Sequence, residues 1–438
     1  MFPNRQWMMT FFVIVGIGML LSALIPPMQS PDEHDHIKRA YLLAHLSSAY
    51  TMPGHSTGGD IDVGLSEYEN LFAQNLIAKP DARFTAKLGR EAAAIRWTHQ
   101  KSFVDMAGAA PYFPLGYLPQ AIGLRVGEAL DLTVGTSYRL ARIITLVTIA
   151  AIISTAFVVW MPNALLVCVL ALPMTMFQIA SASADGLSFA WLILAVSLFM
   201  VGMQRSMEFR GWHAALILLA VFMVTTARPQ LLPILALPAA VFIMRKEWRW
   251  LIATALVSAS VLLWMNTAAH IVDLRMPRSV TAGQATSLYV SHPVEFAAVL
   301  GRTLADHIYH KFYWQGFVGM LGWLDRPLPE FAYFVCGIGL CAALLLSIER
   351  GAILNLSLLI GCALAAILLT FFAMLVTWTD QPAKFIVGVQ GRYFIGPAIL
   401  VAYALGSPRG AWRYILCGAF IIFSTSITVS TLLWKYYL

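Results

Sequence analysis

Long apolar stretches separated by short polar segments make up most of the 438-residue chain. A helix that crosses a bilayer needs about 20 predominantly apolar residues, and eleven stretches reach or approach that length. They are 7–26, 143–160, 164–181, 186–203, 213–227, 229–244, 250–265, 330–347, 352–376, 393–407 and 413–433. The pattern predicts an all-α integral membrane protein, a bundle of about eleven transmembrane helices that forms one domain over residues 1–438. The first stretch is expected to remain as an uncleaved helix.

Two long stretches, 27–142 and 266–329, interrupt this pattern. Lys and Arg concentrate in the short cytoplasmic loops of membrane proteins, which allows the orientation to be tested. With the N-terminus in the cytoplasm, the inner segments hold Arg5, Arg205, Arg210, Arg245, Lys246, Arg249, Arg350, Arg409 and Arg413, and the outer ones hold Arg228, Lys384, Arg392 and Lys435. We therefore expect both long stretches to be periplasmic loops at a bacterial inner membrane. The moderately apolar piece 111–130 must then be interfacial or re-entrant.

Residues 213–244 fit either one long tilted helix or a hairpin of two short arms. Basic residues flank both ends, which a hairpin with both ends in the cytoplasm explains. Arg228 would then lie at the tip, below the outer surface, in a protein-lined cavity, because an arginine that faces lipid costs several kcal/mol. No acidic residue is near it in the sequence. An anionic ligand such as a lipid phosphate is the expected partner.

The composition agrees with a membrane protein, since 59% of the residues are hydrophobic and only 12% are charged. A formal charge of +7 would suggest nucleic acid in a soluble protein. Here the basic residues lie in short loops beside apolar stretches, so membrane orientation explains them and no nucleic acid partner is expected. The five cysteines lie in apolar runs without the spacing of metal ligands and are expected to be core residues.

The polar segment "SPDEHDH" directly follows the first apolar stretch. Ser30 and Glu33 have the spacing of a capping box, in which Ser30 caps a helix and Glu33 returns to the Ser30 amide. The helix should place an apolar face in the membrane interface, formed by Ile37, Ala40, Tyr41 and Ala44. The opposite face carries Asp32, His36 and Arg39.

Asp32 has two interpretations. It can balance the helix dipole in the first turn, or it can act as a general base for a hydroxyl group. The neighbouring His34, Asp35 and His36 are candidate ligands for a divalent metal, but adjacent helix positions diverge by about 100°. We therefore expect these three residues to be solvated at the membrane interface and assign no metal ligand. A divalent metal is not required by this prediction and is not excluded by it.

This segment and the other polar clusters all fall on the outer side in this topology, at 30–36, 111–117, 181–186, 226–230, 322–330 and 377–394. This arrangement predicts one site open to the periplasm rather than a path through the membrane. Asp185 is either a helix cap or a functional acid. In "GVQGRYF", Gln390, Arg392 and Tyr393 supply an amide, a guanidinium and an aromatic ring, and an aromatic belt explains only Tyr393.

Several segments together resemble a known family. They are "PDE-x-x-H" after the first stretch, "PYFPLGYLPQAIG", "SYRLARI", "ALPMTMFQIASASADG" and the late "GVQGRYF". From about residue 25 to 400 the chain resembles a widespread bacterial family of membrane proteins known as a domain of unknown function and grouped with the GT-C glycosyltransferases. That resemblance implies a GT-C-like helical fold in which an acid just after the first span acts in sugar transfer from a polyprenyl phosphate.

The resemblance places Asp32 at the catalytic position, with Glu33 as its neighbour in an Asp-Glu pair. It likens Asp185 to a second acidic position and Arg228 to a basic residue near the donor phosphate. The full set of expected substrate-binding residues is His36, Arg39, Tyr112, Asp185, Arg228, Gln390, Arg392 and Tyr393. The aromatic segment 309–317 is a further candidate contact for the acceptor.

We therefore expect an inverting glycosyltransferase that uses a polyprenyl-phosphate sugar donor and a cell-surface or lipid-linked glycan acceptor at the periplasmic face. No cofactor is required by such a reaction. A transporter or flippase for a lipid-linked saccharide is the main alternative, but it should carry charge at mid-bilayer and inverted repeats, which the sequence lacks apart from Arg228. A non-catalytic partner in envelope polysaccharide assembly is the other.

Overall fold

The computed structural model describes residues 5–79, 81–205, 207–276, 278–348, 353–405 and 411–438. Arg350 and Arg409, which were counted for the orientation, lie outside these residues. The described chain is mostly helical, with two short antiparallel strand pairs. The prediction of a mostly helical protein with several membrane-spanning helices is confirmed, whereas the number of eleven spans stays a prediction.

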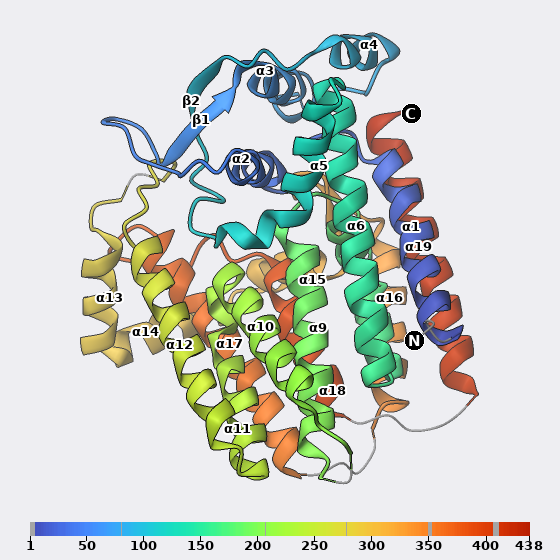
Figure 1. Ribbon diagram of the computed structural model, residues 1–438, viewed down its shortest axis with the longest axis vertical. Helices are drawn as coiled ribbons and strands as arrows, with labels where there is room; N and C mark the ends of the chain where they lie inside the picture. The colour runs from blue at the N-terminus through green and yellow to red at the C-terminus, as the bar shows by residue number, and fades with distance from the viewer. Residues whose placement is uncertain (1–4, 80, 206, 277, 349–352, 406–410) are drawn as a thin grey trace.

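Within the described residues, six helices are long and apolar enough to cross a membrane. They are α1 (Arg5–Leu24), α6 (Val134–Val159), α9 (Ala184–Met203), α12 (Trp248–Ala268), α17 (Ile353–Thr377) and α19 (Trp412–Tyr436). They run side by side as one bundle (Figure 1). Shorter apolar helices complete it, namely α10 (Gly211–Ala227), η3 (Pro229–Leu235), α11 (Ala236–Arg245), α16 (Glu330–Leu345) and α18 (Ile395–Ala404). The apolar core of this bundle is the largest in the molecule.

The stretch 164–181, expected as one helix, forms two short ones, α7 (Ala164–Leu170) and α8 (Pro173–Ile179). Pro173 lacks the amide hydrogen that would continue α7, and it begins α8 instead. Neither helix is long enough to span a bilayer alone.

The predicted hairpin at 213–244 is present, since the chain reverses at Arg228 between α10 and η3. The Arg245 guanidinium donates to the carbonyl oxygens of Gly202 at 2.7 Å and Gln204 at 2.9 Å, which returns α11 to the end of α9. The turns between α9 and α10 and between α11 and α12 lie at the end of the bundle away from α2 (Figure 1). Several of the basic residues counted as cytoplasmic therefore lie opposite the α1–α2 turn.

A cap of small elements covers the other end of the bundle (Figure 1). It comprises α2 (Glu33–Ala44), β1 (Gly58–Asp62), α3 (Val63–Phe72), η1 (Ala73–Ile77), α4 (Ala86–Ala94), β2 (Lys101–Asp105), η2 (Pro114–Tyr117) and α5 (Leu118–Ala129). A second apolar core lies inside it. The expected interfacial position of α2 is wrong, because Ile37, Ala40 and Tyr41 are buried in this core by the rest of the cap.

The piece 111–130 forms η2 and α5, and α5 has only 12 residues, too few to cross a bilayer. Its exposed side chains include Leu118, Ile122 and Val126, which follow one another at four-residue spacing and so form an apolar stripe. This surface fits the expected contact with the membrane interface.

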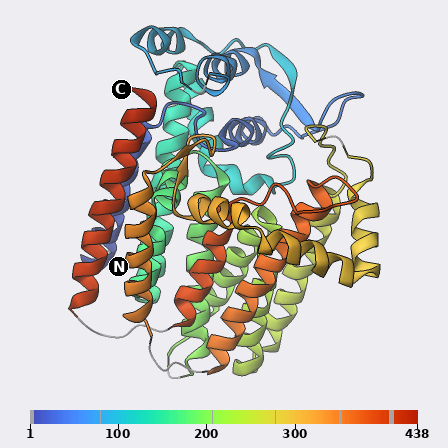
Figure 2. The same ribbon diagram turned by 180° about the vertical axis from the view of Figure 1, so that it is seen from behind.

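The second long stretch also forms helices, α13 (Ala282–Ser291), α14 (Pro293–Ala305) and α15 (His307–Val318), followed by the strand pair β3 (Met320–Leu321) and β4 (Arg326–Pro327). Figure 2 shows α14 and α15 lying across the bundle helices. Helix α15 packs closely on η4 (Gly391–Phe394), where a Cβ at Gly391 would lie 2.0 Å from the backbone carbonyl oxygen of Tyr313. Only glycine allows this approach, which fixes the position of η4.

Candidate functional site

Two aspartates and two arginines from four distant segments form one chain of ion pairs beneath the cap. The Arg392 guanidinium donates from Nη2 to Oδ2 of Asp32 at 2.7 Å and from Nη1 to Oδ2 of Asp185 at 3.1 Å. Arg228 pairs with the other oxygen of Asp185. Its Nη1 donates to the Tyr112 hydroxyl at 3.1 Å. The structure thus brings together these five residues, all of which were expected from the sequence.

Only one member of this charge network is open to solvent to a substantial degree. The side chain of Asp32 is 34% exposed, against 5% for Asp185, 10% for Arg228 and 3% for Arg392. Burial acts to raise the pKa of Asp32, but the charge of Arg392 and the hydrogen bond from it outweigh this effect and hold that pKa below its usual range. Asp32 is therefore ionised at neutral pH.

His36 and Arg39 lie on the α2 face that adjoins Tyr112. The Nδ1 atom of His36 is 2.7 Å from the Tyr117 hydroxyl, and its ring stacks on that of Tyr112 with centroids 5.9 Å apart. Burial lowers the pKa of His36 to about 4, even though the charge of Asp32 opposes the shift, so the imidazole is neutral at pH 7. Arg39 donates from Nη2 to the Tyr112 carbonyl oxygen at 3.2 Å.

The "GVQGRYF" segment contributes through η4 and the residue before it. Gln390 Oε1 accepts a hydrogen bond from Nε of Arg392 at 2.6 Å, so Gln390 orients that guanidinium. The Arg392 guanidinium lies 5.4 Å from the centroid of the Tyr393 ring. Both residues therefore act on Arg392, the partner shared by the two aspartates.

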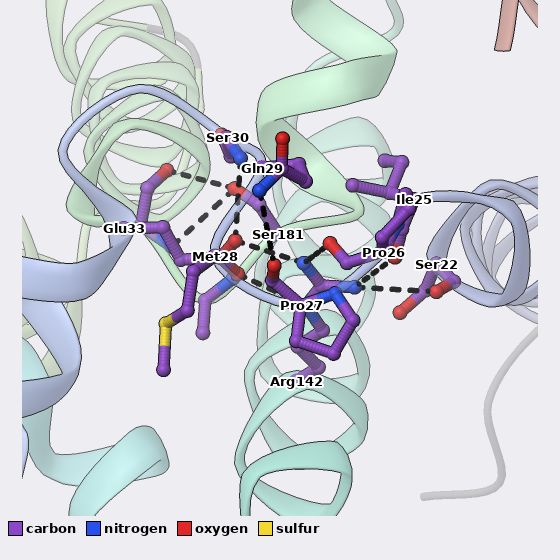
Figure 3. A network of polar contacts seen from close by, with 12 residues as sticks. Ser22, Ile25, Pro26, Pro27, Met28, Gln29, Ser30, Glu33, Arg142 and Ser181 are labelled. Carbon is purple, nitrogen blue, oxygen red and sulfur yellow. Dashed lines mark hydrogen bonds and ion pairs between the residues drawn. The ribbon is translucent and has the colours of Figure 1, made fainter. Parts of the chain in front are cut away.

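Glu33 is placed differently from its neighbour Asp32. It is fully buried and forms an ion pair with Arg142, which donates from Nε at 2.9 Å and from Nη2 at 2.8 Å (Figure 3). Its carboxylate also accepts from the amides of Ala182 at 2.8 Å and Ser30 at 3.4 Å. The predicted return to the Ser30 amide is present, but the helix begins at Glu33 after Asp32, not after Ser30. We correct the expected catalytic role of Glu33 to a structural one.

Arg142 is the functional neighbour that sequence reasoning missed. It lies inside α6, and it donates to the carbonyl oxygens of Ile25 at 2.8 Å and Pro26 at 3.2 Å in the α1–α2 turn (Figure 3). Arg142 and Glu33 thus connect the turn that carries Asp32 to Ala182, which lies three residues before Asp185, through their hydrogen bonds. The position of Arg142 one residue before an expected span was the available signal.

Arg228 does not need the lipid phosphate that we expected as its partner, because Asp185, 43 positions earlier, neutralises it. The expected solvated positions of Asp35 and His36 are also wrong, since both residues are buried. Asp35 is buried, pairs with Lys38 at 3.0 Å and accepts from the Gly108 amide at 2.8 Å. Among the described residues, no three His, Cys, Asp or Glu side chains are placed to hold a metal ion.

The segment 309–317, expected as an acceptor contact, is partly inside the protein. Tyr313 is buried against Phe371 and Phe394, with ring centroids 5.8 Å and 5.7 Å away. Trp314 is the exposed aromatic side chain of this helix, and it faces α16 rather than the charge network.

The arrangement presents one ionised, partly exposed carboxylate backed by buried guanidinium groups. A carboxylate in this setting can hold a hydroxyl group by a hydrogen bond and accept its proton. The Arg392 guanidinium keeps this carboxylate in its charged form. Tyr112 and Tyr393 supply aromatic surface beside them.

Comparison with known proteins adds a family. A search of curated proteins and a search of solved structures each found no match to the chain. Residues 14–401 match the family described as "Predicted membrane protein (DUF2142)". The match covers every residue of the charge network and its neighbours. The chain therefore belongs to this family of membrane proteins.

Proposed function

We propose that the protein is a membrane glycosyltransferase of the GT-C type, with about eleven crossings, that moves a sugar from a polyprenyl-phosphate donor to a cell-surface or lipid-linked glycan. The reaction would take place at the periplasmic face of a bacterial inner membrane. The observation that carries this proposal is the exposure of Asp32, which is the one accessible carboxylate in a network of buried charges.

In the proposed reaction, Asp32 accepts the proton of the acceptor hydroxyl as its oxygen attacks the anomeric carbon. The bond between that carbon and the donor phosphate breaks, and the phosphate leaves with the bonding electron pair. Displacement from the opposite side inverts the anomeric centre and needs one base. Phosphate is already a good leaving group, so no separate general acid is required.

The low pKa of Asp32 makes it a weak base while Arg392 holds it. An anionic donor close to Arg392 would offset part of the guanidinium charge, and the pKa of Asp32 would then rise. Asp32 would thus become a better base when the donor is bound.

An apolar groove supports a lipid-linked substrate. It lies between α15, which packs on η4, and α16, and its volume is about 850 Å³. Trp314, Phe334 and Ile338 line it, and Lys311 and Glu330 form a pair 3.0 Å apart among its polar lining residues. A prenyl chain would fit such a surface by burial of apolar area.

The position of the charges favours an enzyme over a transporter. A transporter binds its cargo near the middle of the bilayer, whereas this network lies where α1, α9 and α10 meet the cap. A non-catalytic partner in envelope assembly would not need Asp32 to be ionised and accessible.

The test is the surface glycan profile of cells that lack the protein, complemented with wild type, Asp32→Asn or Asp131→Asn at equal membrane levels. Asp131 is the matched control, because it is exposed and has positive φ like Asp32, 52° against 59°. Asn tolerates that backbone conformation at both sites. We expect wild type and Asp131→Asn to restore a missing sugar and Asp32→Asn to lower transfer by roughly 100- to 10,000-fold. Full restoration by Asp32→Asn would overturn the proposal.

A further inference from the structure

The two arginines expected to bind an anion are already neutralised. Every nitrogen of the Arg392 guanidinium makes a hydrogen bond, from Nε to Gln390, from Nη1 to Asp185 and from Nη2 to Asp32. Arg228 shares Asp185 with it. Two guanidinium charges thus face two carboxylate charges. An anion that bound to either arginine would have to compete with a carboxylate.

Arg39 is different from every other buried cation that the structure describes. The buried Lys and Arg side chains are Lys38, Arg39, Arg142, Arg228, Arg392 and Lys435. All except Arg39 have a carboxylate oxygen within 4.0 Å. The residue is only 5% exposed. A charge withdrawn from water without a partner is costly, so this arrangement indicates that something else supplies the negative charge.

The hydrogen bonds of Arg39 show where a ligand would approach. Nη2 donates to the Tyr112 carbonyl oxygen, whereas Nε is sealed from solvent and has no hydrogen-bond partner. Nη1 also makes no hydrogen bond within the described chain, but it is not sealed. Burial lowers the pKa of Arg39, yet an arginine stays protonated at any physiological pH. The open Nη1 edge is therefore a charged donor that lacks an acceptor.

Tyr112 joins Arg39 to the charge network. Its carbonyl oxygen accepts from Arg39, and its hydroxyl accepts from Arg228 at 3.1 Å. Arg39 and the Arg228–Asp185 pair thus contact the same residue, Tyr112, at its backbone and at its side chain. Asp32 and Asp185 balance the charges of Arg228 and Arg392. Arg39 therefore adds one positive charge that no carboxylate of the described chain balances within 4.0 Å.

We propose that Arg39 is the phosphate subsite of this protein, and that a phosphate group supplies the missing negative charge at its Nη1 edge. A guanidinium nitrogen donates strong charge-assisted hydrogen bonds to phosphate oxygens, and Nη1 of Arg39 carries N–H groups that no acceptor in the described chain takes up. The identification of that phosphate with a lipid-linked sugar donor rests on the proposed function. The subsite itself does not, because it follows from the unpaired charge alone.

The experiment uses the full chain purified in nanodiscs, with wild type, Arg39→Gln, Arg39→Lys and Arg125→Gln. Arg125 is the control, since it is an exposed cap arginine that pairs with Glu128. Three probes separate the sources of phosphate: a short-chain prenyl phosphate, inorganic phosphate, and phosphatidylglycerol in the disc lipid. We expect Arg39→Gln to weaken binding of at least one probe roughly ten- to hundredfold, with partial retention in Arg39→Lys and no change in Arg125→Gln.

A stability measurement separates ligand binding from a merely structural role. Without ligand, Arg39→Gln should unfold no more easily than wild type, because the substitution removes an unpaired buried charge and keeps a donor for Tyr112. Unchanged binding of all probes in Arg39→Gln, no binding by wild type, or a large loss of stability would each overturn the subsite. Loss of inorganic phosphate or phosphatidylglycerol binding alone would support the subsite and count against a prenyl phosphate donor.

Discussion

Replacement of Glu33 by Gln should destabilise the protein more than any other single neutralisation in the cap. Each oxygen of this carboxylate accepts two hydrogen bonds, Oε1 from Arg142 Nε and the Ala182 amide, Oε2 from Arg142 Nη2 and the Ser30 amide. A Gln side chain must therefore turn its NH₂ group toward two donors in either orientation. The Arg142 charge also stays buried without a counterion. We expect the substitution to lower the free energy of unfolding by about 3–5 kcal/mol.

The assay is unfolding of the purified protein in mixed micelles at increasing SDS fraction, followed by tryptophan fluorescence. Glu69→Gln is the control, because Glu69 is 15% exposed and its partner Lys38 keeps the Asp35 contact at 3.0 Å. We expect a loss of about 1 kcal/mol there. Equal losses in the two variants would refute the assignment of Glu33 as a buried counterion.

A double-mutant cycle gives a sharper test of the same pair. Arg142→Gln and Glu33→Gln combined should lose less stability than the sum of the two single variants, with a coupling of about 1–3 kcal/mol. The reason is that the second substitution removes the charge that the first left unpaired. Strict additivity would show that the two side chains contribute independently, contrary to their contacts.

Two further predictions concern α2 and η4. The free energy of unfolding should fall as the pH drops from 6.5 to 5, because His36 has a pKa of about 4 in the folded protein and near 6.5 in the unfolded chain, so the unfolded chain takes up the proton first. In unfolding curves measured across this pH range, His36→Gln should make the free energy of unfolding depend less on pH. An unchanged pH dependence would exclude His36 as its source. Gly391→Ala should lose both stability and glycan transfer, because its Cβ would lie 2.3 Å from the Phe317 amide nitrogen. Gly418→Ala is the control, since a Cβ there meets no atom within 4 Å, and its melting point and glycan profile should equal those of wild type.

The long helices were predictable because composition alone decides them. The expected stretches 7–26 and 186–203 correspond to α1 and α9 within a few residues, since a run of apolar residues of that length has no stable alternative in a bilayer. The break at Pro173 was also available from the sequence, because a proline tends to end a helix at the residue before it. It was overlooked because hydropathy continues through it.

The partners within the site could not be read from the sequence. Asp185 and Arg228 are 43 positions apart, and no local spacing brings them together. Glu33 was grouped with Asp32 because they are neighbours, yet neighbouring side chains at a helix start point in different directions, one to Arg142 and one to Arg392. The polar segments were expected to share one face of the bundle, and the contacts that join Asp32, Asp185 and Arg392 agree with that part of the prediction. The membrane side of this face stays a prediction.

The pairing of Asp32 with Arg392 joins residues 360 positions apart, and this separation has a consequence for biosynthesis. A chain emerges from the ribosome N-terminus first, so Asp32 reaches its side of the membrane long before Arg392 is translated. During that interval Asp32 lacks the guanidinium that pairs with it in the full chain. A nascent chain that stops short of η4 therefore has the first turn without a site. The charge network therefore assembles only after η4 has been synthesised and has reached the cap, rather than when any one helix forms.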